Sequence, residues 1–271
     1  MSVPPEVAAF YASFLEESRL TVGPARLEFE RTKDLLARLL PPPPAKIVDV
    51  GGAGGAYSLW LAAQGYDVDL VDASRRLVDV ARAQSARAEK PIASLHVADA
   101  RSLPQSDASA AAVLVMGPLY HLQDAADRAR ALAETFRVLA PGGVAVVAAI
   151  SRYASTLDGM ARKLSLDPRF VAIRDRDLAD GAHSNTTDNP DYFTTAYLHR
   201  PEDLRRELTE AGLEDVAVFG IEGPGWILPD FGARWGDPAL RKDLLDVARA
   251  LEDQPSIVGI SAHLLGTGRK P

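Results

Sequence analysis

Apolar residues along the chain recur with two different spacings. Short runs rich in Val, Ile, Leu and Ala alternate with longer stretches whose apolar residues fall at helical intervals. Strands are predicted at residues 46–50, 67–72, 92–99, 110–117, 144–150, 214–223 and 256–270. Helices are predicted at residues 6–20, 26–40, 56–65, 74–90, 124–139 and 201–212. Strands that alternate with helices are typical of an α/β fold with a mostly parallel sheet and helices on both faces.

Two segments interrupt this alternation. Residues 151–200 are rich in Asp, Asn, Thr and aromatic residues and show no clear period, which predicts an irregular substrate lid. Residues 223–256 form a second, partly helical insertion. We expect a single domain over residues 1–271, composed of an N-terminal helical extension, a cofactor-binding core, the lid and the C-terminal part of the sheet, at residues 1–45, 46–150, 151–200 and 201–271.

A glycine-rich turn, Gly51–Gly55, follows the first strand and opens a helix. Glycine allows a tight turn and the close approach of a ligand to the backbone. The second strand ends in Asp72, whose carboxylate can accept hydrogen bonds from two ribose hydroxyls. The unit therefore predicts a ligand of the adenosine type; a plain tight turn with a charged strand end is the alternative.

Three kinds of cofactor compete for this turn. A triphosphate site needs a Lys after the loop, and none follows here. A dinucleotide site would place Tyr57 where a small residue has to pack between helix and strand. Asp49, inside the first strand, would repel a pyrophosphate but would favour a ligand that carries an ammonium and a sulfonium. These observations favour S-adenosylmethionine.

The composition of the chain limits the kinds of molecule that it is expected to bind. The net charge is −7 and no basic stripe appears, which argues against nucleic acid or an anionic membrane surface. The chain has no cysteine, and no closely spaced histidine pair that would suggest a metal site. It has no apolar run long enough to span a bilayer, and its first residues lack the basic segment of a signal peptide. We expect a soluble cytoplasmic protein that binds a small molecule and no metal, with a homodimer as the base-rate expectation.

Five motifs in order resemble the class I S-adenosylmethionine-dependent methyltransferases: "VDVGGAGG", Asp72, "VADA", "VLVMGPLYHL" and "RVLAPGG". "GPLYHL" and "TTAYLHRPEDL" are similar to a small-molecule branch of the type 11 group. The resemblance is firm over residues 46–150 and loose over the rest. It implies a Rossmann-like seven-stranded mixed sheet of order 3-2-1-4-5-7-6 with strand 7 antiparallel. Ala53 stands where the family has its middle glycine, and is expected to be tolerated if its φ stays negative.

The resemblance also implies the cofactor contacts. Asp49 and Gly51 would border the methionine part, and Asp99 would bind the adenine amino group, with Met116 and Gly117 beneath the sugar and sulfonium. Arg31 would pair with the cofactor carboxylate or simply be a solvated helix residue; the first helix would cover the cofactor or only pack. The full set of expected cofactor residues is Asp49, Gly51, Gly52, Gly55, Asp72, Ala73, Asp99, Ala100, Met116, Gly117, Arg31 and Tyr11.

The chemistry is expected after the fourth strand, because ligands in such sheets bind where the strand order reverses. His121 is a candidate general base for an acceptor, or a structural residue of its loop; Tyr120 borders the substrate or only packs. Candidate substrate residues, each also explicable as a surface or hydrogen-bonded residue, are Arg152, His183, Tyr197, His199 and Trp226.

Four functions remain open at this point. The resemblance favours methyl transfer to a small molecule with release of S-adenosylhomocysteine. The same cofactor would also serve transfer or cyclisation of its aminocarboxypropyl arm. An NAD-dependent oxidoreductase and a regulatory module with a vestigial site are the remaining alternatives.

Overall fold

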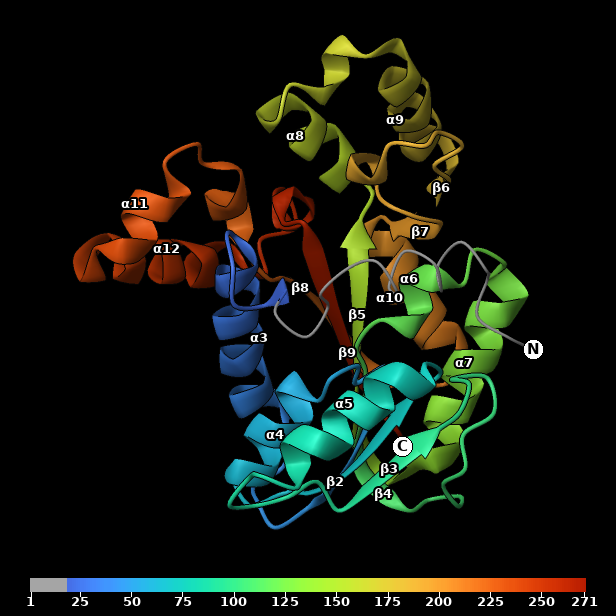
Figure 1. Cartoon of the computed structure of the whole chain (residues 1–271). Helices are drawn as coiled ribbons and strands as arrows, with labels where there is room; N and C mark the ends of the chain where they lie inside the picture. The colour runs from blue at the N-terminus through green and yellow to red at the C-terminus, as the bar shows by residue number, and fades with distance from the viewer. Residues whose placement is uncertain (1–18) are drawn as a thin grey trace.

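A mixed sheet forms the centre of the computed structural model, which describes residues 19–271 (Figure 1). Within that range the sheet contains nine strands. They are β1 (Lys46–Val50), β2 (Asp67–Asp72), β3 (Ser94–Val97), β4 (Ala110–Val115), β5 (Leu139–Ser151), β6 (Ala182–His183), β7 (Ala196–His199), β8 (Glu214–Gly220) and β9 (His263–Arg269).

The strand order follows the prediction. Strands β3, β2, β1, β4 and β5 are parallel neighbours, β9 pairs antiparallel with β5, and β8 pairs antiparallel with β9. The seven expected strands therefore lie in the order β3-β2-β1-β4-β5-β9-β8, which confirms the predicted 3-2-1-4-5-7-6 arrangement. The last strand begins later than expected, at His263, because Val258–Ile260 form a 3₁₀ turn, η4.

Helices cover both faces of the sheet. They are α3 (Ala25–Leu39), α4 (Ala56–Ala63), α5 (Arg75–Ser85), α6 (Pro118–His121), α7 (Ala125–Val138), α8 (Ala154–Ala161), α9 (Pro168–Asp180), α10 (Pro201–Glu210), α11 (Phe231–Gly236) and α12 (Pro238–Leu251), with 3₁₀ turns η1 (Leu164–Leu166), η2 (Pro190–Tyr192) and η3 (Gly223–Ile227). No helix in the described range is long and apolar enough to cross a membrane. The predicted helix at residues 6–20 lies almost wholly outside that range.

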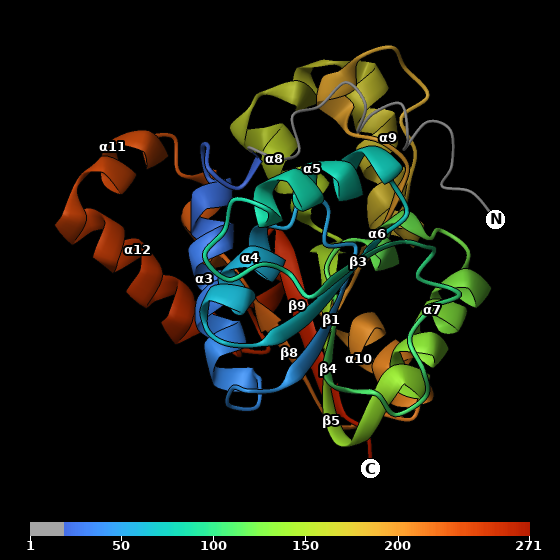
Figure 2. The same cartoon turned by 60° about the horizontal axis from the view of Figure 1, so that its bottom comes forward.

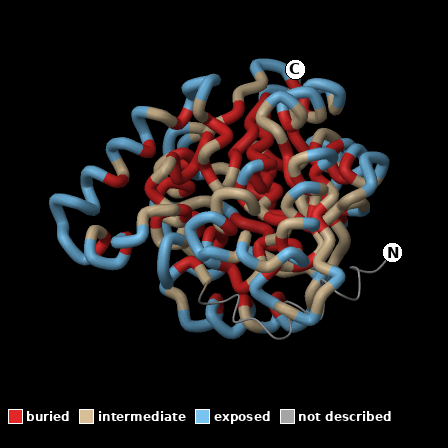
Figure 3. Tube along the Cα trace, turned by 90° about the horizontal axis from the view of Figure 1, so that it is seen from above, coloured by how far each residue is buried: buried red, intermediate tan, exposed pale blue. Residues whose placement is uncertain are grey.

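The hydrophobic core has two halves, one on each face of the sheet. Successive residues of a strand point to opposite faces, so Ile47 packs with α3 and α4, whereas Val48 packs with α7 and α10. The central strands are buried on both sides, which explains why they are nearly continuous apolar runs. The buried part of the chain gathers at the centre in Figure 3, while α11 and α12 are largely exposed.

The insertion at residues 151–200 is more regular than its sequence pattern predicted. It contains α8, α9 and the antiparallel pair β6–β7, and Figure 1 shows it above the carboxyl end of β5. Helix α9 is capped by Asp167 and ends at Asp180, and Gly181, which follows it, has a left-handed conformation. Its buried apolar face consists only of Phe170 and Ile173, so no clear helical period is visible in the sequence.

A buried ion-pair network joins α12 to α3, which lie side by side in Figures 1 and 2. Arg31 is 2% exposed, donates to Glu252 and Asp34, and its Nε donates to the Ile221 carbonyl at 3.3 Å. Arg38 also donates to Glu252, at 2.8 and 2.7 Å. The network therefore fixes the end of the second insertion against helix α3.

We expect Glu252→Gln to lower the free energy of unfolding by about 2–3 kcal/mol. Breaking a buried ion pair costs about 3–5 kcal/mol, but Asp34 remains as a counterion for Arg31. Urea unfolding measures the change. The control is Glu210→Gln, at an exposed helix-end carboxylate 3.8 Å from Arg206, which should change stability by less than about 0.5 kcal/mol. Equal stability of the two variants would contradict a structural role for the network.

Candidate active site

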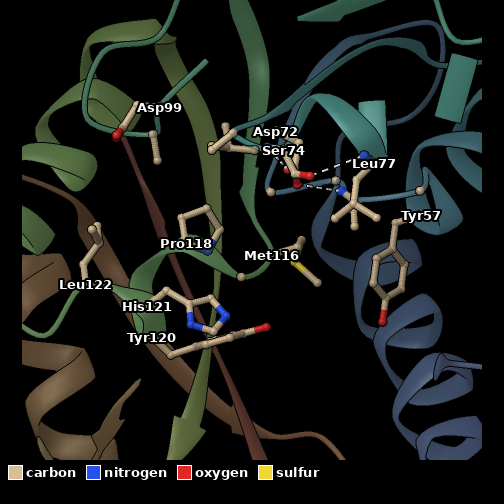
Figure 4. A pocket seen from close by; sticks show the side chains of 18 of the residues that line it. Tyr57, Asp72, Ser74, Leu77, Asp99, Met116, Pro118, Tyr120, His121 and Leu122 are labelled. Carbon is tan, nitrogen blue, oxygen red and sulfur yellow. Dashed lines mark hydrogen bonds between the residues drawn. The ribbon is translucent and has the colours of Figure 1, made fainter. Parts of the chain in front are cut away.

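A cavity of about 600 Å³ opens at the carboxyl ends of β1, β2 and β4. The turns after β1, β2, β3 and β4 bound it, and Figure 4 shows Asp72 and Asp99 on one side with Tyr120 and His121 on the other. Eight of the expected cofactor residues line it: Gly51, Gly52, Asp72, Ala73, Asp99, Ala100, Met116 and Gly117. The sheet edge thus brings together residues from four separate turns.

The glycine turn is held against β2 and against the turn after β4. The Gly51 and Gly52 amides donate to the Val71 carbonyl at 2.7 and 3.3 Å. Gly51 has a φ of +78°, and a Cβ there would lie 2.3 Å from Pro118 Cδ. Only glycine fits such a position, because a side chain would meet both steric strain and a ring carbon. The two turns that bound the cavity therefore touch each other at Gly51.

Ala53 departs from the expectation for the middle of the loop. Its φ is +46°, so the condition under which its methyl group is expected to be tolerated, a negative φ, is not met, and the residue adopts the left-handed region that favours glycine. The Ala53 amide donates to Asp72 Oδ2 at 3.0 Å, and this bond holds the strained conformation. The loop consequently keeps its shape despite the methyl group.

Asp72 ends β2 inside the cavity wall. Its Oδ1 accepts a hydrogen bond from the Ser74 amide at 2.8 Å, while Oδ2 accepts that of Ala53 (Figure 4 draws part of this arrangement). Burial raises the pKa of Asp72, and the two amide bonds oppose that rise. Each carboxylate oxygen retains a further lone pair, so the group can still accept hydrogen bonds from a vicinal diol.

Asp49 and Gly55 do not line the cavity. Asp49 is fully buried behind the loop, where its Oδ2 accepts a 2.6 Å hydrogen bond from Ser58. Its Oδ1 has no hydrogen-bond partner among the described residues. Burial raises the pKa of Asp49 to about 6, against the opposing effect of the Ser58 hydroxyl. The buried carboxylate therefore has little local compensation for its charge.

Arg101 binds Asp99 on the far side of the cavity. Its Nε and Nη2 donate to the two carboxylate oxygens at 2.9 and 2.6 Å, and its Nη1 donates to Asp127 at 2.7 Å. Burial raises the pKa of Asp99, but the hydrogen bonds and charge of Arg101 outweigh it and hold the pKa below its usual value. Sequence reasoning missed Arg101, which lines the cavity as the fixed partner of Asp99.

Tyr120 and His121 lie on α6, directly after β4, with ring centroids 4.7 Å apart. The His121 Nδ1 is 3.3 Å from the Thr195 carbonyl; since a carbonyl only accepts, Nδ1 carries the proton and Nε2 the lone pair. Burial lowers the pKa of His121 to about 4, although the Thr195 bond opposes this. The imidazole is therefore neutral at physiological pH.

A second cavity, of about 370 Å³, lies beneath the insertion. Its walls come from β5, α8, α9, η2, η3 and the start of β9. Among the described residues, Arg19 and Tyr120 line both cavities. Of the candidate substrate residues, His183 and Trp226 line the second cavity.

Three candidate substrate residues line neither cavity. Arg152 is 3% exposed and its Nε donates to the Leu198 carbonyl at 2.7 Å. Tyr197 has its ring 3.7 Å from the Arg128 guanidinium. His199 is fully buried, with its Nε2 3.2 Å from Glu207. These side chains fix α10 and β7 to the sheet.

Two further residues expected to bind the cofactor, Arg31 and Tyr11, come from the N-terminal part of the chain. Arg31 is not among the residues that line the first cavity, since its side chain is bound to Glu252 and Asp34. Tyr11 lies outside the described residues. Arg19, which the sequence gave no reason to select, lines the cavity and donates to both oxygens of Glu28 at 2.6 and 3.0 Å.

Glu28, Glu222 and His263 form a group that sequence spacing could not reveal, because they come from three separate segments. Their ligand atoms lie within 4.8 Å of one another, close enough to hold a metal ion. Burial lowers the pKa of His263, but Glu28 and Glu222 outweigh it and raise the pKa to about 9. The two carboxylates are thus already balanced by protonated His263 and by Arg19.

The parallel centre of the mixed sheet, the glycine turn and the acidic strand end are typical of α/β domains that bind a nucleotide-type cofactor at the carboxyl edge of the sheet. Residues 47–143 match the family model described as a methyltransferase domain. A ubiquinone/menaquinone biosynthesis C-methyltransferase of Acidiphilium cryptum is 35% identical over 115 residues, which are 41% of this chain and 44% of that protein.

Solved structures show the same fold. An S-adenosylmethionine-dependent methyltransferase from Mesorhizobium loti is 21% identical, with a TM-score of 0.58 over 90% of this chain and 100% of that one. Another from Methanosarcina mazei is 19% identical, with a TM-score of 0.58 over 87% and 96% of the two chains. Residues 47–143 therefore match a methyltransferase domain, and the chain shares its fold with these S-adenosylmethionine-dependent methyltransferases. The chain matches less than half the length of its curated relative.

We expect Asp49→Asn to stabilise the ligand-free protein above pH 6. The folded pKa of Asp49, about 6, exceeds its ordinary value of 3.8, so the folded state binds more protons between these values and stability falls as pH rises through them. The neutral isostere removes this fall and gains on the order of 2–3 kcal/mol at pH 7.5. Urea unfolding at pH 4.5 and 7.5 measures the difference.

The control for this prediction is Asp67→Asn, at the exposed start of β2, which should show no such pH-dependent gain. A variant at Asp49 with the same pH dependence as the unmodified protein would show that this carboxylate is not strained by burial.

Proposed function

We propose that the protein transfers the methyl group of S-adenosylmethionine to a small-molecule acceptor. The observation that carries this proposal is the meeting of two cavities at Tyr120: one contains the expected cofactor residues, and the other lies beneath the insertion. A donor in the first cavity and an acceptor in the second would face each other across this residue. Holding two reactants in line supplies much of the catalysis that a displacement reaction needs.

The first cavity suits the methyl donor on physical grounds. Asp72, Asp99 and Ala100 line this cavity, and in our proposal Asp72 accepts the ribose hydroxyls while Asp99 and Ala100 border the adenine. Neutral His121 adds no positive charge beside a sulfonium. The buried carboxylate of Asp49 favours a cationic ligand nearby. When bound, S-adenosylmethionine supplies an electrophilic methyl group on a sulfonium.

His121 is proposed to receive a proton from the acceptor. Bound S-adenosylmethionine would supply the methyl group to the acceptor atom and would leave as neutral S-adenosylhomocysteine. An acceptor O–H or N–H must then lose its proton, and His121 Nε2 is a lone-pair site in the cavity wall. With a pKa of about 4 it is a weak base, suited to an acceptor whose acidity rises as the new bond forms.

The cofactor assignment predicts a thermal shift with S-adenosylmethionine and S-adenosylhomocysteine, and none with NAD. A ligand at about 100 times its dissociation constant stabilises a protein by roughly 2.7 kcal/mol, which moves the unfolding midpoint by several degrees at this chain length. Asp72→Asn should reduce the shift strongly, because it replaces one of the two acceptor oxygens with an NH2 donor and thereby disturbs the glycine turn.

The matched control is again Asp67→Asn, on the same strand but outside the cavity, which should retain the full shift. A shift with NAD alone would refute the cofactor assignment. Product masses separate methyl transfer, which gives S-adenosylhomocysteine, from use of the aminocarboxypropyl arm, which gives methylthioadenosine.

The role of His121 predicts that His121→Ala lowers kcat by about 10²–10³-fold while leaving the dissociation constant of S-adenosylhomocysteine within about threefold. In the unmodified enzyme, kcat should fall at low pH with a midpoint near pH 4 rather than 6.5. His121 becomes protonated, and can no longer accept a proton, only below its lowered pKa. His96→Ala, on β3 and outside both cavities, is the control. An unchanged kcat in the His121 variant would remove this residue from proton transfer.

A further inference from the structure

The second cavity has several aromatic side chains in its walls. Five aromatic side chains line it, and all belong to elements around the insertion or its entrance: Tyr120, Phe170, Tyr192, Phe193 and Trp226. Two of them are fixed by hydrogen bonds: Trp226 Nε1 donates to the Ile260 carbonyl at 3.0 Å, and Tyr192 Oη donates to Asp167 at 2.7 Å. The ring of Phe170 packs 5.2 Å from that of Tyr192. The walls are therefore preorganised for an apolar or aromatic body.

Phe193 is held in this wall against backbone strain. Its φ of 64° and ψ of −169° fall in a region otherwise almost confined to glycine. Asn185 Nδ2 donates to the Phe193 carbonyl at 3.0 Å, and His183 Nε2 lies 2.8 Å from the preceding carbonyl, of Tyr192. The Phe193 ring lies 6.4 Å from that of His121 and 6.0 Å from that of His183. Its strained backbone thus sets a ring between the two cavities.

The charges near the entrance compensate each other. Arg19 is paired with Glu28, and His263, protonated at neutral pH, is paired with Glu222 at 2.5 Å. Each pair contributes no net charge to the cavity. The pair His183–Asp177, at 2.8 Å, adds no positive charge either.

The outer end of the cavity differs. Arg162 lies between two carboxylates, Asp158 at 3.1 Å and Asp191 at 3.0 Å. One guanidinium faces two carboxylates, so among residues 19–271 one negative charge is left over where these residues line the cavity. Burial raises the pKa of Asp158, a cost that a bound cation would relieve.

We infer that the acceptor is an aromatic or similarly apolar amine, whose ammonium group lies at Asp158 and whose methyl-accepting end lies at Tyr120. The inference rests on the proposed function and adds the class of its substrate. Aromatic faces attract cations, and a carboxylate beside them adds Coulomb attraction. A carboxylate-bearing acceptor of the same shape would meet the unbalanced negative charge and bind more weakly.

The test is isothermal titration of the full-length protein, first with S-adenosylhomocysteine and then, at saturation, with matched probes. The pairs are tryptamine with indole-3-propionate and phenethylamine with 3-phenylpropionate, at pH 7.5. We expect each amine to bind at least tenfold more tightly than its carboxylate partner. Asp158→Asn should reduce this preference to within about threefold. Arg162→Gln should increase it severalfold, because it removes the competing cation at an exposed position.

The control is Asp175→Asn, at an exposed carboxylate of α9 that pairs with Arg174 and lines neither cavity; the amine preference should be unchanged. If S-adenosylhomocysteine binds but neither amine exceeds its carboxylate partner, the amine inference is overturned while the proposed function stands. If the preference persists in Asp158→Asn and does not rise in Arg162→Gln, the assigned carboxylate is wrong. Failure of S-adenosylhomocysteine to bind would instead reject the proposed function.

Discussion

The carboxylate of Asp72 sets the geometry on which the rest of the site depends. Its two oxygens accept the amides of Ala53 and Ser74, so one side chain ties the glycine turn to the end of β2 and to the start of α5. The turn in turn contacts Pro118 through Gly51, which positions α6 with Tyr120 and His121. A single half-buried acid thereby connects three of the turns that bound the cavity. Because these bonds use backbone amides, they hold the cavity open in a fixed shape before any ligand binds.

The second constraint is the length of β5. Its register with β9 runs from Val144 to Ile150, and its last two residues, Ile150 and Ser151, pair with β7. The insertion is therefore joined to the sheet through backbone hydrogen bonds. This differs from a loosely attached flap, and it explains how η2 and Phe193 can be held close to α6. A wall anchored in the sheet can keep an acceptor in line with a donor, which a mobile loop would do less well.

Local sequence patterns predicted the parts of the molecule that depend on local physics. The five parallel strands, the Ser74 helix cap and the placement of Asp72 follow from apolar periodicity and turn chemistry, and the structure has them. The fate of Arg31 could not be predicted, because its partner Glu252 is 221 residues away in sequence. The positive φ of Ala53 depends likewise on the hydrogen bond that its amide donates to Asp72 at the end of another strand. Arg19 carries no motif, and only the fold brings it to both cavities.

The charges of the groups around the two cavities indicate which kind of ligand this edge of the sheet favours. Burial keeps His121 neutral, so no imidazolium faces the place expected for the methyl group. Burial also leaves Asp49 with a charge that the surrounding protein compensates poorly. A neutral His121 and a charged Asp49 both make the site more negative. They therefore disfavour an anionic pyrophosphate and favour a cationic sulfonium. At the outer end of the second cavity, Asp158 and Asp191 exceed the charge of Arg162. In the proposed complex a cationic acceptor and a cationic donor would repel each other. Tyr120, and Arg19 paired with Glu28, lie where the two cavities meet and add no net charge there. The repulsion is small when the atom that accepts the methyl group is uncharged and the ammonium group lies far from it. For this reason the proposal puts the ammonium group at Asp158 and Asp191, away from the methyl group.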